Sequence, residues 1–441
     1  MAANIRTSKF KHIYGQPLKK EESFDDVLVS KSALDTSFCD VNPKFIALIL
    51  ECSGGGSFLI LPIEKYGRHS PNVPVANGHS KAVTDLRWCP HDDNIIASAS
   101  DDCTIKIWNV EEPGPDAKDA NLTFSELATL THHERRVNLI LWHPSVKNVL
   151  LTAGNDNLLT LCNLETTEII AQQTFEKPVC SASFNFDGSK LVIGLKDGHV
   201  AILNAKNLEI LQIEKCHDST KPCQVAYLRG EKIFTTGFGR GGKRLYALCD
   251  AKELTKMYTS EEIDNNNGVM FIQYDSDLNL LFLVGKGDSV VRYFEYDEQE
   301  ANIFYLNRFD SQEPQRGFAF MGKRGVNVQA CEITRLYKVH AKKVEVIPFV
   351  VPRKSEHFQK DLYPDTPGLE PALTVAEWLD GKDSTPILVS FRIDLPRTSA
   401  CLDKSALFKF ISLMIQLIET CAWIPLFVFT LCRDVMMLLF L

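Results

Sequence analysis

The sequence lacks features that mark several whole classes of protein. Its first residues contain no apolar run that could act as a secretory signal, and no Cys-x-x-Cys pair occurs in the chain. Glycine (24 residues) and proline (20) are near their average frequencies for 441 residues, which excludes collagen-like and low-complexity chains. The 13 cysteines are odd in number and scattered through apolar runs, so they fit buried thiols in a reducing compartment better than a disulfide framework. We therefore expect a cytosolic protein.

Signatures of catalysis and of metal or nucleic-acid binding are also missing. A net charge of −8 argues against a dedicated nucleic-acid binder, whose affinity comes mainly from neutralising phosphates. Cys216, His217 and Cys223 lack a fourth ligand at metal spacing, and the Gly-Lys-Gly-Asp-Ser run at 285–289 lies between predicted strands rather than before a helix. No nucleophile elbow or paired-carboxylate context is present. The sequence predicts a non-enzyme with no catalytic residue, metal, cofactor or nucleic-acid partner.

What the chain does contain is a repeat of fixed spacing. Counted from His79, offsets of 4, 9, 11, 23 and 29 hold Val83, Trp88, Pro90, Asp102 and Trp108. Counted from His133, the same offsets hold Val137, Trp142, Pro144, Asp156 and Cys162. A weaker third copy runs through residues 175–203. Within each copy, β-branched stretches of period two are broken by Asp, Asn, Gly and Pro, which predicts three or more strands joined by tight turns.

This pattern resembles the WD repeat, in which four-stranded blades surround a central channel. The resemblance implies a buried network that locks each blade, made of His79, Asp102, Trp108 and either Ser98 or Ser100 in the first copy, and of His133 and Asp156 in the second. Blades that match the pattern less well follow at similar spacing, so residues 8–350 accommodate seven blades of about 45 residues each. Counting alone leaves six or eight blades open. A strand near Phe10–Tyr14 is expected to join the last blade and close the ring.

Several stretches carry a more specific resemblance. They are residues 8–17 (SKFKHIYGQP), 42–62, 285–295 (GKGDSVVRYFE), 313–317 (EPQRG), 331–335 (CEITR), 351–366 (VPRKSEHFQKDLYPDT) and 376–390 (AEWLDGKDSTPILVS). In these stretches the chain resembles the coronins. The resemblance implies an all-β fold: a seven-bladed WD-repeat β-propeller at 1–350 with a C-terminal extension at 351–395 packed against it. A linker at 396–406 and an apolar, helical tail at 407–441 would follow.

The same resemblance implies a function in the actin cytoskeleton. Coronins bind actin filaments, regulate their organisation and turnover at the cell cortex, and use a C-terminal coiled coil to oligomerise and to contact the filament-branching complex. Two departures stand out. Where the family carries a basic residue in a D-x-R-V-S context, this chain has Leu28. Beyond Ala400 no heptad pattern occurs, so the coiled coil is absent and contact with the branching complex is doubtful.

Local basic clusters in this acidic chain suit an acidic filament or an anionic membrane surface. The cluster expected to contact actin is N-terminal and comprises Lys9, Lys11, Lys19, Lys20, Leu28 and Lys31. A second basic cluster lies in a glycine-rich loop and comprises Arg240, Lys243 and Arg244.

The apolar end of the chain leaves three interpretations open. Residues 410–432 are long enough to span a bilayer as a helix, but Glu419 near their centre makes insertion marginal. The segment is a tail anchor, an amphipathic or partner-buried helix, or an alternative or aberrant C-terminus, which we favour. Two functions therefore compete with actin regulation: a scaffold propeller without strong filament affinity in trafficking or signalling, and a membrane-tethered variant.

Overall fold

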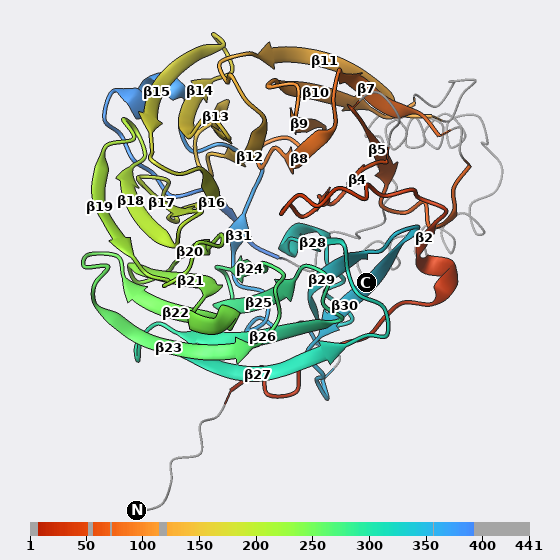
Figure 1. Ribbon diagram of the computed structural model, residues 1–441. Helices are drawn as coiled ribbons and strands as arrows, with labels where there is room; N and C mark the ends of the chain where they lie inside the picture. Colours follow the sequence, from red (N-terminus) through yellow and green to blue (C-terminus); the bar gives the residue numbers. More distant parts are fainter. Residues whose placement is uncertain (1–7, 52–55, 71–72, 114–120, 356, 392–441) are drawn as a thin grey trace, which may run out of the picture. The chain divides into compact units, whose positions relative to one another are not determined.

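The computed structural model describes residues 8–391, except 52–55, 71–72, 114–120 and 356. Within this range the chain folds into six four-stranded sheets and one six-stranded sheet, arranged as blades around a central axis (Figure 1). The prediction of a seven-bladed β-propeller is confirmed, and the alternatives of six or eight blades are excluded. The predicted linker and tail at 396–441 lie outside the described residues, and no described helix has the length and apolar character needed to cross a bilayer.

The first four blades follow the chain order from residue 39. Blade 1 contains β3 (Cys39–Val41), β4 (Phe45–Ile49), β5 (Gly56–Pro62) and β7 (Val75–His79). Blade 2 contains β8 (Val83–Trp88), β9 (Ile95–Ser100), β10 (Ile105–Glu111) and β11 (Thr123–Leu130). Blade 3 contains β12 (Val137–Trp142), β13 (Val149–Gly154), β14 (Leu158–Asn163) and β15 (Glu168–Thr174). Blade 4 contains β16 (Val179–Phe184), β17 (Lys190–Leu195), β18 (His199–Asn204) and β19 (Ile210–Lys215).

The remaining blades complete the ring. Blade 5 contains β20 (Gln224–Leu228), β21 (Lys232–Phe238), β22 (Arg244–Asp250) and β23 (Met257–Asp264). Blade 6 contains β24 (Met270–Asp275), β25 (Leu280–Gly285), β26 (Val290–Asp297) and β27 (Asn302–Asp310). Blade 7 contains β28 (Gly317–Met321), β29 (Glu332–Val339) and β30 (Lys343–Val350), joined by β1 (Tyr14–Gly15), β2 (Phe24–Asp25) and β6 (Gly67–Arg68). Three 3₁₀ turns are η1 (Lys20–Glu22), η2 (Arg240–Gly242) and η3 (Lys323–Gly325).

Position within a blade decides how apolar each strand is. The second strands of the blades are almost wholly buried, as in β13 and β25, because neighbouring blades cover both of their faces. Apolar residues therefore form continuous runs there instead of alternating. The outer strands, such as β19 and β23, are mostly exposed and carry more polar residues.

The N-terminal segment runs along the outer side of β30 and ties the ring together. Tyr14 pairs with Val350 at one end of β30, and the Val27 amide donates to the carbonyl oxygen of Lys342 at the other. The strand expected near Phe10–Tyr14 begins only at Tyr14. Phe10 instead packs into the core, where it is 1% exposed.

The C-terminal extension crosses one face of the propeller from blade 7 to blade 3. It contains β31 (Thr366–Pro367), α1 (Val375–Leu379) and β32 (Leu388–Val389), and β31 lies near the centre of the ring (Figure 1). The Ala372 amide donates to the carbonyl oxygen of Ser145 in blade 3 (2.9 Å). We call this side of the propeller the extension face. The domain boundaries at residues 350, 395 and 406 stay predictions.

The anchor of the extension is Trp378, which is fully buried. Thr374 and Glu377 form a capping box that starts α1, so this short helix is held in place by its first turn as well as by packing. The Trp378 ring meets the imidazole of His143 edge-on at 4.8 Å between centroids. The Nε2 atom of His143 lies 3.0 Å from the Gly188 carbonyl oxygen, and a Cβ on Gly188 would lie 2.2 Å from this ring. Blades 3 and 4 and the extension therefore meet at one packed joint.

Candidate functional site

The histidine network expected from the repeat is assembled where the end of β7 in blade 1 meets blade 2. His79 Nδ1 lies 3.1 Å from Asp102, and His79 Nε2 lies 2.7 Å from the Ser98 hydroxyl oxygen. Trp108 donates from Nε1 to the same oxygen at 2.8 Å. Ser98 therefore occupies the position that the sequence left open, while the Ser100 hydroxyl donates to backbone carbonyls. Burial lowers the pKa of His79, which keeps the ring neutral in this network.

Blade 3 contains a variant of the same network. His133 lies 3.0 Å from Asp156 and 2.9 Å from the Thr152 hydroxyl oxygen. Cys162 stands at the position of Trp108, and its sulfur lies 3.8 Å from His132. His132 Nε2 lies 2.9 Å from the same Thr152 oxygen, so a second histidine takes the place of the indole. Both histidines are buried and lie at hydrogen-bond distance from these side chains. Their role is therefore to join strands rather than to catalyse a reaction.

The N-terminal residues expected to contact actin do not form one patch. Lys9 and Lys11 lie at the extension face, where Lys9 donates from Nζ to the carbonyl oxygen of Asp361 (2.6 Å). Leu28 and Lys31 follow the opposite end of β30, because the Val29 amide donates to Ala341 in the turn after β29. The eight residues of β30 separate these ends by about 25 Å.

The other two residues of that predicted cluster lie between its ends. Lys19 and Lys20 are exposed at η1, on the outer side of β30. The nearby amide of Leu18 donates to the carbonyl oxygen of Val346. The predicted cluster is therefore an elongated stripe along β30 rather than one compact patch, and its contact with actin stays a prediction.

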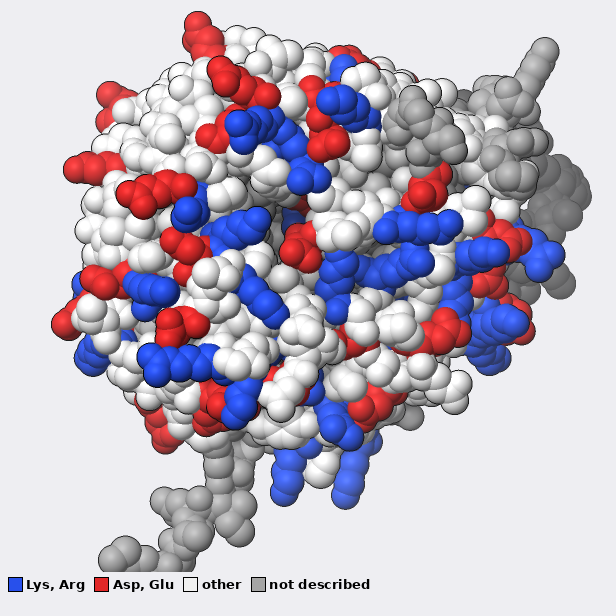
Figure 2. Space-filling model, viewed as in Figure 1, with Lys and Arg blue, Asp and Glu red and all other residues white. Residues whose placement is uncertain are grey.

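The end of β30 away from the extension carries a surface that we call the blade 7–blade 1 rim. It consists of Leu28, Lys31, Arg68 and Lys342. All four side chains are exposed, Leu28 by 58%. Figure 2 shows basic side chains gathered over the part of the ring where β2 lies, with acidic side chains between them. An apolar side chain among three cations is suited to an acidic protein surface that has its own apolar contact.

Arg68 was missed in the sequence because a parallel pairing brings it to the rim. β6 is only two residues long and pairs with β2, so that Arg68 stands beside Asp25. Its Nε lies 2.9 Å from Asp26, and its side chain is 84% exposed. No local pattern in the sequence announces a two-residue strand that joins a blade from outside it.

The second basic cluster is divided between the surface and the core, so a role in surface binding is wrong for Arg244. This side chain is 1% exposed and forms ion pairs with Asp264 (2.6 Å) and Asp288 (2.7 Å). Arg240 and Lys243 are exposed, but each pairs with a neighbouring carboxylate. Arg244 instead links blades 5 and 6 through paired, buried charges.

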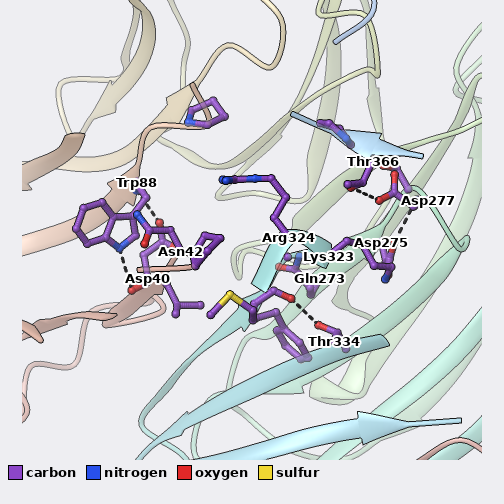
Figure 3. A pocket seen from close by; sticks show the side chains of 18 of the residues that line it. Asp40, Asn42, Trp88, Gln273, Asp275, Asp277, Lys323, Arg324, Thr334 and Thr366 are labelled. Atoms are coloured by element: carbon purple, nitrogen blue, oxygen red, sulfur yellow. Dashed lines mark hydrogen bonds and ion pairs between the residues drawn. The ribbon is translucent and has the colours of Figure 1, made fainter. Parts of the chain in front are cut away.

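A cavity of about 370 Å³ opens on the extension face, between blades 1, 2, 6 and 7 and β31. Figure 3 shows several of its polar side chains engaged in hydrogen bonds and ion pairs along its walls. Thr366 donates to Asp277 (2.6 Å), Lys323 is paired with Asp275, and Asp40 accepts from the Trp88 amide (2.7 Å). Burial raises the pKa of both Asp40 and Asp277 to about 6. Thr366 holds the extension to the ring, the other two interactions join neighbouring blades, and we assign the cavity no ligand.

The described residues show no metal-binding chemistry. No group of three or more His, Cys, Asp or Glu in this part of the chain is arranged to hold a metal ion. Nine described cysteines are free thiols, and burial raises the pKa of several, including Cys89 to about 11. Such thiols are poor nucleophiles and metal ligands at neutral pH.

Comparison with known proteins identifies the family. Models described as a domain of unknown function (DUF1899), a WD domain with G-beta repeat, and a type of WD40 repeat match residues 3–68, 72–109 and 344–386. Coronin-2A of Homo sapiens is 39% identical over 396 residues, which are 88% of this chain and 74% of that protein. The chain belongs to the coronin family. The crystal structure of the WD40 domain from Toxoplasma gondii coronin has a TM-score of 0.81 at 28% identity, covering 87% of this chain and 98% of that one.

The resemblance inferred from the short motifs is thus confirmed. A chain of the mitotic checkpoint complex, at 13% identity and a TM-score of 0.57, shares the fold alone. Coronins are WD-repeat propellers that in general bind actin and act as non-enzymatic scaffolds. Leu28, where the resemblance implied a basic residue, is one of the exposed residues of the rim.

Proposed function

We propose that this coronin binds actin filaments through the blade 7–blade 1 rim and regulates filament organisation and turnover at the cell cortex, in the cytoplasm. The family assignment supports actin as the partner. The exposed rim supports the location, because it combines an apolar side chain with exposed cations, of which Arg68 pairs with the exposed Asp26. The opposite end of the N-terminal segment is a poorer candidate, since Lys9 is engaged by the extension.

Leu28 sets the expected strength of this interaction. A well-made basic contact at a polar interface contributes about 1–3 kcal/mol, so its absence weakens binding about tenfold or more. Lys31 and Arg68 flank the position and retain part of the positive field. Filament binding should therefore persist, with low affinity and a marked dependence on salt.

Co-sedimentation with filamentous actin across a salt series tests the proposal. The full chain is compared with Leu28→Arg, Arg68→Glu and Lys177→Glu. Lys177 is an exposed lysine before blade 4, away from the rim, and serves as the matched charge-reversal control. We expect Leu28→Arg to bind about tenfold more tightly, Arg68→Glu to bind severalfold more weakly, and Lys177→Glu to behave like the wild type.

The result also separates the competing functions. Pelleting of Leu28→Arg but not of the wild type would favour a scaffold propeller in trafficking or signalling, for which the exposed Leu28 is the supporting observation. Failure of every variant to pellet would overturn actin as the partner. Flotation with anionic vesicles then tests the basic rim against a membrane surface, with the same Lys177→Glu control.

A further inference from the structure

A buried histidine lies directly beneath the rim. His340 is in the turn between β29 and β30, and its side chain is 5% exposed. The next two residues, Ala341 and Lys342, accept backbone hydrogen bonds from Val29 and Val27, at 3.3 and 3.1 Å. The turn that contains His340 is therefore the clamp for the segment carrying Leu28.

Both ring nitrogens of His340 face hydrogen-bond acceptors. Nδ1 lies 3.2 Å from the Pro314 carbonyl oxygen and 3.5 Å from a carboxylate oxygen of Glu313. Nε2 lies 3.4 Å from a carboxylate oxygen of Glu345. A neutral imidazole carries one N–H, so either tautomer leaves a nitrogen lone pair pointing at an oxygen. Only the imidazolium donates on both sides.

The other charged groups around the ring balance one another. Glu313 comes from the connection between β27 and β28, and Glu345 from β30. The two lysines are Lys343 on β30, whose Nζ lies 3.1 Å from Glu313, and Lys338 on β29, which donates to the Glu313 carbonyl oxygen. The nearest charges to the His340 ring are thus the two carboxylates. The hydrogen bond from His340 also lowers the pKa of Glu345, which keeps that partner ionised.

We propose that His340 is a proton-operated clamp that regulates the rim. When protonated, it bridges the connection before blade 7 to β30, fixes the turn, and orders Val27–Val29. It also places a positive charge under a surface that is already basic. Both effects act in the same direction, so filament binding strengthens when the His340 imidazole is protonated. The second effect rests on the proposed function, whereas the first does not.

The first test uses no actin. Amide hydrogen exchange of residues 27–29 is followed in the full chain at pH 6.2 and 7.6, after correction for the intrinsic effect of pH on exchange. Protection in the wild type should be about threefold or more higher at pH 6.2, and His340→Gln should abolish this difference. His12→Gln, an exposed histidine on the extension face, is the control and should keep it. Equal protection at both pH values in the wild type would overturn the clamp.

The second test is filament co-sedimentation at the same two pH values. Because actin itself responds to pH, the measured quantity is the ratio of wild-type to His340→Gln affinity on the same filaments. This ratio should be about threefold or more higher at pH 6.2. A ratio independent of pH would overturn the link to binding. If no protein pellets at either pH value but the exchange result holds, actin is not the partner, and the proposed clamp stands on the exchange result alone.

Discussion

The two faces of the propeller use their polar residues in different ways. On the extension face, Asp277, Lys323 and Asp275 are engaged with partners from other strands or from the extension, and Trp378 is fully buried beneath it. At the opposite end of the blades, the rim exposes Leu28 by 58%. On the first face these polar side chains contact one another or the extension, whereas the rim leaves Leu28 exposed to solvent. If actin binds at the rim as proposed, the contacts that hold the molecule together and the binding surface lie at opposite ends of β30.

The largest expected effect is on the cohesive face. Trp378→Ala should lower the free energy of unfolding by about 3–5 kcal/mol, because it removes a fully buried aromatic side chain from the joint with His143. Chemical denaturation measures this loss, and filament affinity should stay unchanged. Leu379→Ala, at an adjacent residue that is 50% exposed, is the control and should cost little. A small effect of Trp378→Ala would mean that packing of the extension contributes little to the stability of the propeller.

Two buried groups on the extension face should change the pH dependence of stability in opposite directions. Burial lowers the pKa of His143 to about 4, so the unfolded chain takes up this proton first, and stability falls by about 2 kcal/mol between pH 7 and 5. Burial raises the pKa of Asp277 to about 6, so the folded chain takes up that proton first, and stability rises by about 1 kcal/mol over the same range.

Two variants separate these opposite contributions. His143→Gln should make the denaturation midpoint less sensitive to acid, whereas Asp277→Asn should make it more sensitive. Urea unfolding at pH 7 and 5 measures both slopes. Slopes that move in the same direction would show that at least one of the two groups is not buried in the way described.

The blade networks give a third and smaller effect. Ser98→Ala leaves both the His79 ring and the Trp108 indole without their shared partner, and should cost about 1–3 kcal/mol. Thr152→Ala removes the corresponding hydroxyl in blade 3, whose oxygen lies 2.9 Å from both His133 and His132, and should cost about the same. Thermal unfolding compares the two variants. A much smaller loss for Ser98→Ala than for Thr152→Ala would mean that the indole contributes nothing through Ser98.

How much of this could be predicted follows from what each feature depends on. The blades and the His79 network depend on spacing within about 30 residues, so the sequence predicted them, although it left the choice between Ser98 and Ser100 to the structure. The rim depends on pairings between distant segments. Arg68 reaches it only because β6 joins β2, and Arg244 is buried because Asp264 and Asp288 come from other strands. A single sequence contains no local signal for either event.

The smallest expected change in stability lies at the rim. There a substitution should alter filament affinity while leaving stability almost unchanged. Asp26→Asn breaks an exposed ion pair with Arg68, and such pairs contribute about 0–1 kcal/mol, so the unfolding midpoint should hardly move. Asn also tolerates the left-handed backbone of this residue (φ 63°). Yet the change frees a cation and removes an anion beside Leu28, so filament affinity should rise by about two- to fivefold at low salt. The control is Asp310→Asn, which breaks the similarly exposed pair with Arg308 in blade 6 and should alter neither quantity. A gain in affinity from both variants would show only an effect of net charge, and no gain from Asp26→Asn would place the filament contact away from the rim.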